Sequence, residues 1–284
     1  MKEPKFFLTD GRPPDRAGQR GPGDAHSAQE WIWRREQYER LFAAAPVDSL
    51  RFESTPFYLW DKTSHARIAA ALPDVRLIAV IRDPIDRAFS NWTHLRADGL
   101  EPEADFLTAC LDEDRRIAAG WAPFWRYLEL GRYGDQLHSL FQHVDPSAVR
   151  VIRYRQLIDA PRQTLDDLCT FLGVETGLLN TLPESNLGRW ASDNPVNSLL
   201  RKGIRLGSAA GAHVDPRVWR TAERPLLNVM QRGTASRPRL GPRDRVQLVQ
   251  RFTDDNALLG TLLGADYSDW LAPEGRGSYT VRRS

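Results

Sequence analysis

The stretch VRLIAVIRDPIDRAFS, residues 75–90, decides the fold of this chain. Its apolar run ends at Ile81, is rich in β-branched residues and predicts a buried parallel strand. Asp83 and Pro84 then predict the start of a helix, because a proline in the first turn needs no N–H. The sequence therefore predicts a strand-to-helix junction, with Arg82 at the point where the strand ends.

Two side chains at this junction suit a bound phosphate. Arg82 can donate to two phosphate oxygens, and Ser90, one to two turns into the helix, can donate its hydroxyl to a third. The alternative is an arginine that closes the strand and pairs with Asp83 or Asp86. The junction alone favours the ion pair, and the wider context of the chain favours the phosphate.

Strands and helices alternate over the first two thirds of the chain. This order predicts an α/β fold in three layers, with a parallel sheet flanked by helices. The expected strands are 50–53, 75–81 and 149–154; the expected helices are 30–44, 63–72, from 84 onward, 104–119, 133–141, 161–172 and 244–263. We expect a single domain over 1–284, with a flexible loop at 9–29, a less regular helical region for the acceptor at 183–240 and a frayed tail at 272–284.

Composition excludes several classes of protein. The chain has 284 residues, of which 41% are hydrophobic and 27% charged, as in ordinary globular proteins. A net charge of +2 gives no electrostatic case for nucleic acid. No apolar run approaches the roughly 18 residues of a membrane span, and no signal peptide is recognisable, so we expect a cytoplasmic enzyme. Six scattered histidines and two cysteines show no metal-ligand spacing, and the sequence does not indicate an oligomeric state.

Four segments, in order, resemble the sulfotransferases that use 3′-phosphoadenylyl sulfate (PAPS), in their bacterial and heparan-sulfate-type branch. They are KEPKFF (2–7), FESTPFY (52–58), RDPIDRAFS (82–90), and the pair RYRQL and FLGV within 153–174. The resemblance implies a fold like that of P-loop NTPases and transfer of a sulfonate from PAPS to a hydroxyl. The acceptor would be a small molecule, a glycolipid or a glycan, and no metal would be required.

The same resemblance implies roles for five residues. Glu3 would be the general base that activates the acceptor hydroxyl; the alternative is a solvated glutamate. His94 follows Ser90 by one helical turn and would bind the sulfonate in transfer, and a buried structural histidine is the alternative. Arg82 and Ser90 would bind the 3′-phosphate of the donor, and Arg189 would belong to a loop that closes over the nucleotide.

The chain departs from the family pattern in two places. Ser54 stands where many relatives have a lysine, whose function would be lost or moved to Lys5 or Lys62. In the family, a first strand and a glycine-rich phosphate loop precede the segment that here begins after Met1. The sequence thus predicts that this strand and loop are missing, either because the true protein starts upstream, which we favour, or through a real truncation.

Two other functions remain open. A truncated protein could keep the fold without transferase activity, which the missing phosphate loop favours. A nucleotide kinase-like enzyme using ATP is disfavoured, because the chain has no G-x-x-x-x-G-K-[ST] motif and no aspartate at a strand end suited to Mg²⁺.

Overall fold

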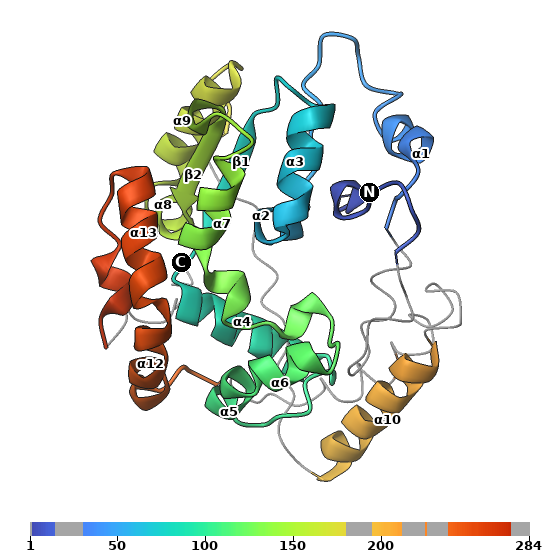
Figure 1. Cartoon of the computed structure of the whole chain (residues 1–284), viewed down its shortest axis with the longest axis vertical. Helices are drawn as coiled ribbons and strands as arrows, with labels where there is room; N and C mark the ends of the chain where they lie inside the picture. Colours follow the sequence, from blue (N-terminus) through green and yellow to red (C-terminus); the bar gives the residue numbers. More distant parts are fainter. Residues whose placement is uncertain (1, 15–30, 180–194, 212–224, 226–237, 274–284) are drawn as a thin grey trace.

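The computed structural model describes residues 2–14, 31–179, 195–211, 225 and 238–273. Within these ranges the sheet consists of β1 (Leu77–Ile81) and β2 (Val149–Arg153), which run parallel and in register. Helices surround the sheet (Figure 1). The predicted α/β fold, with helices packed around a parallel sheet, is confirmed.

The remaining elements are helices and short 3-10 turns. In chain order they are η1 (Phe6–Leu8), α1 (Arg35–Arg40), α2 (Phe57–Trp60), α3 (Lys62–Ala71), α4 (Pro84–Ala97), α5 (Phe106–Leu111), α6 (Glu113–Ala118), η3 (Pro123–Trp125), η4 (Glu129–Gly131), α7 (Tyr133–Leu140), η5 (Pro146–Ala148), α8 (Tyr154–Asp159), α9 (Pro161–Leu172), α10 (Pro195–Gly211), α12 (Pro242–Val249), η6 (Gln250–Phe252), α13 (Thr253–Leu263) and η7 (Ser268–Leu271). No helix in the described ranges is long and apolar enough to cross a membrane.

The junction between β1 and α4 forms as the sequence predicts. Asp83 is the N-cap of α4, and its side chain accepts hydrogen bonds from the backbone N–H groups of Ile85 (2.9 Å) and Asp86 (3.1 Å). The prediction that β1 is buried on both faces is wrong. Ile81 is fully buried against α7 and α13, whereas Ile78 and Val80 point to the opposite face and are 40% and 49% exposed.

Four other sequence predictions need correction. Residues 50–53 form no strand, because Leu50 and Phe52 face solvent instead of a core. The helix expected over 104–119 is divided into α5 and α6 at Asp112. The Asp112 carboxylate accepts hydrogen bonds from the side chains of Arg115 and Arg116 at this break. The helix expected over 244–263 is interrupted by η6, and that expected over 30–44 is limited to α1.

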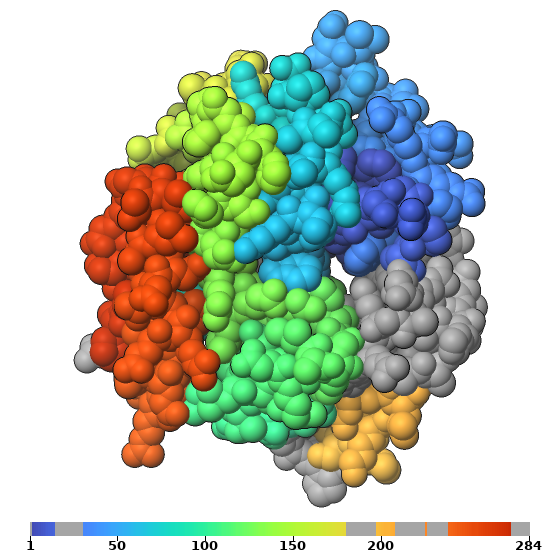
Figure 2. Space-filling model, in the orientation of Figure 1, coloured from blue at the N-terminus to red at the C-terminus, as the bar shows by residue number. Residues whose placement is uncertain are grey.

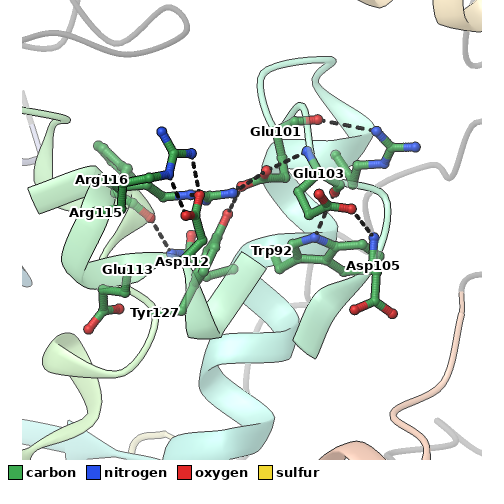
Figure 3. A network of polar contacts seen from close by, with 12 residues as sticks. Trp92, Glu101, Glu103, Asp105, Asp112, Glu113, Arg115, Arg116 and Tyr127 are labelled. Atoms are coloured by element: carbon green, nitrogen blue, oxygen red, sulfur yellow. Dashed lines mark hydrogen bonds and ion pairs between the residues drawn. The ribbon is translucent and has the colours of Figure 1, made fainter. Parts of the chain in front are cut away.

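A buried polar network holds the segment between α4 and α7 in place (Figure 3). The Glu101 side chain is fully buried and accepts two hydrogen bonds from the Arg116 guanidinium, at 2.8 and 3.0 Å. The Tyr127 hydroxyl donates to the same carboxylate. The Glu113 carboxylate accepts from the backbone N–H of Leu128 at 2.6 Å. These charges are paired or hydrogen-bonded inside the protein, as a structural network requires.

Candidate active site

A cavity of about 370 Å³ lies where both strands end. Its lining includes the following residues from the strand ends, from α4 and from the C-terminal region: Arg82, Asp83, Asp86, Arg153, Tyr154 and Trp270. In open parallel sheets, ligands bind outside the carboxyl ends of the strands. The cavity is therefore the expected position for a nucleotide-type ligand.

The arginines of this cavity are close to carboxylates. The Arg82 Nη2 lies 4.0 Å from Asp86 Oδ2, so the ion pair considered as an alternative for Arg82 is present. Arg153 donates to Asp269 at 3.0 and 3.1 Å. A phosphate that binds Arg82 must therefore compete with the Asp86 carboxylate.

A buried arginine from α12 also contacts the acidic side of the cavity. Arg245 is almost fully buried and donates to Asp83, and it lies 3.3 Å from Asp86. Burial raises the pKa of the Asp86 carboxyl above its ordinary value, the charge of Asp83 raises it further, and Arg82 and Arg245 oppose this. Arg245 thus neutralises part of the charge that would repel an anionic ligand.

The N-terminus of α4 offers fewer donors than the sequence suggested. Asp83 already occupies the N–H groups of Ile85 and Asp86, so an anion near Arg82 depends on side chains. Ser90 lies one turn after Asp86 on the same face of α4 and is half-buried, but it is not among the residues that line the cavity. Its contact with the 3′-phosphate stays a prediction.

His94 lies further along α4. It is about 12 Å along the helix axis from Asp86, and its side chain is 65% exposed. Its Nε2 is 3.4 Å from Asp98 Oδ2, so the alternative of a buried structural histidine does not hold. A role of His94 in binding the sulfonate stays a prediction, and Arg189 lies outside the described residues.

The first and second motifs of the sequence lie side by side. Figure 2 shows the dark-blue N-terminal segment against the cyan segment of α2 and α3. Three hydrogen bonds join residues 2–7 to residues 53–58: Ser54 N to Lys2 O (3.1 Å), Lys5 N to Thr55 Oγ1 (3.2 Å) and Phe7 N to the Tyr58 hydroxyl (3.3 Å). Lys5 adopts a left-handed backbone conformation with φ of 58°, which costs energy for a residue other than glycine.

This contact brings two carboxylates together. Glu3 is half-buried and lies close enough to Glu53 for its charge to raise the pKa of Glu53. Burial is the larger cause of the raised Glu53 pKa, and the hydroxyls of Tyr58 and Thr55 oppose it in part. Thr55 Oγ1 donates to Glu53 Oε2 at 2.9 Å. The pair has the composition of a site that accepts a proton.

Contacts through Phe124 connect α2 with α4. The Phe57 ring packs edge-on against Phe124 at a centroid distance of 5.0 Å. The Phe124 carbonyl accepts a hydrogen bond of 2.7 Å from Asn91 Nδ2, on the residue after Ser90. Phe57 of α2 is therefore connected through Phe124 to the middle of α4, whereas the cavity adjoins the beginning of that helix.

The two lysines considered as replacements at Ser54 differ in environment. Lys62 is on the surface and forms an ion pair of 2.7 Å with Asp135. Lys5 is buried, and its Nζ lies 5.9 Å from the centre of the Trp31 ring. Lys5 is therefore the lysine next to the carboxylate pair. The described ranges contain no cluster of three or more histidine, cysteine or acidic side chains suited to a metal ion.

Sequence reasoning did not single out Arg153, Arg245 or Glu53, which the structure places at the cavity or beside Glu3. Arg153 repeats the pattern of Arg82, an arginine that ends an apolar strand and precedes a helix, so the sequence contained a signal for it. Glu53 was part of a recognised motif without an assigned role. Arg245 follows Asp86 by 159 residues, and no local pattern indicates that contact.

Comparisons with known proteins show the family of this chain. A profile described as "Sulfotransferase family" matches residues 19–177, which is more than half of the chain. This chain belongs to the sulfotransferase family. Its structure is similar to a sulfotransferase from Alicyclobacillus acidocaldarius, with a TM-score of 0.70 and 25% identity over 96% of this chain and 87% of that one.

This chain also resembles heparan sulfate enzymes in sequence. It is 29% identical over 139 residues to human heparan sulfate glucosamine 3-O-sulfotransferase 3B1, and 26% identical over 133 residues to bifunctional heparan sulfate N-deacetylase/N-sulfotransferase 1 of Xenopus tropicalis. The match spans 49% of this chain but only 35% of the human enzyme. For the Xenopus enzyme the shares are 45% and 15%.

Proposed function

We propose that this protein transfers a sulfonate group from PAPS to a hydroxyl of a small molecule, glycolipid or glycan. Arg82 would bind the 3′-phosphate of the donor, with Ser90 further along α4, and Glu3 would take the proton of the acceptor hydroxyl. Family membership supports the reaction class. The heparan sulfate relatives support a glycan as one acceptor class.

One observation carries this proposal more than any other. A guanidinium at the carboxyl end of β1 faces a cavity of about 370 Å³ at the start of α4, and a carboxylate pair lies where residues 2–7 meet residues 53–58. An in-line transfer needs a donor-binding group on one side and a proton acceptor on the other. Arg82 and Glu3 come from these two separate places, one for the donor and one for the acceptor.

The described residues fit the nucleotide end of PAPS. When bound, PAPS supplies the sulfonate group and a stable leaving group, 3′,5′-adenosine bisphosphate. Arg82 suits a phosphate because its guanidinium can donate to two oxygens. Because Arg245 also binds Asp86, Arg82 would exchange its contact with Asp86 for one with the phosphate. The carboxylate of Glu3 would accept the proton from the acceptor oxygen as that oxygen bonds to sulfur.

The experiment is a transfer assay on the full chain with PAPS and a panel of hydroxyl-bearing acceptors, followed by mass spectrometry. A parallel thermal-shift measurement uses 3′,5′-adenosine bisphosphate and, as a comparison, ATP. We expect stabilisation by the bisphosphate and a mass increase in at least one acceptor. A chain that the bisphosphate does not stabilise and that sulfonates no acceptor would contradict the proposal, and stabilisation by ATP alone would favour a kinase-like enzyme.

An amine is the second acceptor class. Among the relatives, the bifunctional enzymes carry N-sulfotransferase in their name, and the others carry 3-O-sulfotransferase. A general base serves both acceptors, since an amine must also lose a proton. The same assay with matched amino and hydroxyl sugars distinguishes them.

A further inference from the structure

We propose that Glu53 is a positioning residue for Glu3 and that the two carboxylates hold the proton of the acceptor as a pair. The inference rests on the proposed function, because it assigns a partner to the base of that reaction. Glu53 is 50 positions away from Glu3 in the sequence, and the reaction does not require Glu53 to touch the substrate.

The backbone geometry places the two carboxylates in a fixed relation. Ser54, next to Glu53, donates its N–H to the carbonyl of Lys2, next to Glu3, at 3.1 Å. On the other side of Glu3, the Lys5 N–H donates to Thr55 Oγ1 at 3.2 Å. Two hydrogen bonds thus flank the pair, so a movement of Glu53 moves the segment that carries Glu3.

The Glu53 carboxylate is itself held from the side away from Glu3. Thr55 Oγ1 accepts from Lys5 and donates to Glu53 Oε2 at 2.9 Å, so one hydroxyl links both segments. The Tyr58 hydroxyl lies beside the same carboxylate and accepts from Phe7 N at 3.3 Å. These hydroxyl contacts orient Glu53.

The surroundings of Glu53 favour its neutral form. The titratable groups that act on it are Glu3 from the N-terminal segment and Tyr58 from α2, and Glu53 in turn acts on Tyr38 of α1. Burial raises the pKa of Glu53, and the charge of Glu3 raises it further. Burial and the Glu53 charge also raise the pKa of Tyr38 and of Tyr58, so both phenols stay neutral near pH 7. A partly buried carboxylate beside a second negative charge, as Glu53 is, binds a proton more readily than an isolated one.

The proton balance of the reaction is then complete. The acceptor oxygen forms a bond to sulfur while the bond between sulfur and the phosphate oxygen of the donor breaks, and the electron pair of that bond leaves with 3′,5′-adenosine bisphosphate. The O–H bond of the acceptor breaks, and its proton moves to Glu3. The Glu3 and Glu53 carboxylates together keep the proton until solvent removes it.

The test compares Glu53→Gln with wild type and with Glu36→Gln, a control at an exposed glutamate of α1. Glutamine keeps an oxygen for Thr55 but cannot share a proton or carry charge. We expect kcat to fall about 10-fold at neutral pH, and the acid limb of the kcat/KM profile to move to lower pH by about half a unit. The KM for PAPS stays unchanged, and Glu53→Asp recovers part of the activity.

Two results would overturn the inference. An acid limb at the wild-type position in a folded Glu53→Gln variant overturns the inference, as does a loss confined to the KM for PAPS. Failure of the proposed function looks different, because then the wild-type chain transfers no sulfonate at all.

A second measurement needs neither activity nor a Glu53 variant that folds well. The carboxyl carbon of Glu53 is followed by ¹³C NMR through a pH titration in wild type and in Glu3→Gln. We expect its midpoint to move to lower pH when the charge of Glu3 is removed. An unchanged midpoint shows that the carboxylates act independently and contradicts the inference.

Discussion

Glu101 and Glu53 are two glutamates with opposite environments. Glu101 is fully buried and has a guanidinium and a phenol as partners, Arg116 and Tyr127. Glu53 is partly buried and has two hydroxyls and another carboxylate as neighbours. Both are hydrogen-bonded, but only the charge of Glu101 is compensated by an arginine.

The difference separates a carboxylate that stabilises the fold from one that can take part in proton transfer. A carboxylate paired with arginine is held in its ionised form and binds a proton poorly. A carboxylate beside another carboxylate binds a proton more easily, at a cost to the folded state. Among the residues that the structure describes, Glu101 is thus compensated by an arginine inside the protein, whereas Glu53 has another carboxylate as a neighbour at the proposed acceptor side.

Breaking the compensated region has the largest expected effect on stability. Arg116→Ala leaves Glu101 buried without its cation, and we expect the free energy of unfolding to fall by about 3–5 kcal/mol. Chemical denaturation followed by circular dichroism measures this. The double variant Glu101→Leu with Arg116→Met is the control and recovers a large part of the loss; a single variant as stable as wild type would contradict the structural role.

The donor side responds through affinity instead of folding. Arg82→Ala removes the guanidinium proposed for the 3′-phosphate, and we expect the affinity for 3′,5′-adenosine bisphosphate to fall about 10- to 100-fold by calorimetry. Arg155→Ala is the matched control, since Arg155 lines the same cavity and pairs with Asp159 at 2.7 Å. Equal losses in both variants would show a general charge effect and not a specific phosphate contact.

The pair of Glu3 and Glu53 predicts a stability that falls as the pH rises. The unfolded Glu53 ionises near its ordinary pKa and the folded one at higher pH, so the folded protein loses stability as the pH rises through this interval. Glu53→Gln cannot ionise and lacks this loss. We expect the stability difference, variant minus wild type, to increase as the pH rises above the ordinary pKa of glutamate, by less than the loss of stability in Arg116→Ala. A difference that is constant with pH would show that Glu53 ionises normally.

His94 should matter least for folding. Its side chain is exposed, and its contact with Asp98 at 3.4 Å is a surface ion pair only when the histidine is charged. We expect His94→Ala to change the free energy of unfolding by less than about 0.5 kcal/mol. A fall in kcat at unchanged stability would support the sulfonate-binding role predicted from the sequence, and an unchanged kcat would remove His94 from the site.

The sequence predicts local features of this fold well and distant contacts poorly. The junction of β1 and α4 depends on neighbouring residues, namely an apolar run, the capping Asp83 and Pro84, so its position could be inferred. The exposed side chains of Ile78 and Val80 depend on which elements cover the strand, and composition does not contain that information.

The candidate site shows the same division. Arg82 was found because its position relative to a strand and a helix is local. The contacts of Lys5 with Thr55 and of Arg245 with Asp86 join residues 50 and 159 positions apart, and they arise only in the folded chain. Arg153 could have been predicted from the sequence, because it ends the second strand as Arg82 follows the first.

The most direct measurement compares Glu3→Gln with wild type in two assays, PAPS-dependent turnover and binding of 3′,5′-adenosine bisphosphate. We expect turnover to fall about 10²- to 10⁴-fold while the affinity for the bisphosphate stays within about twofold. Full turnover in a folded Glu3→Gln protein, or a loss of nucleotide binding as large as that of Arg82→Ala, would contradict the division between a donor side at Arg82 and a proton-accepting side at Glu3.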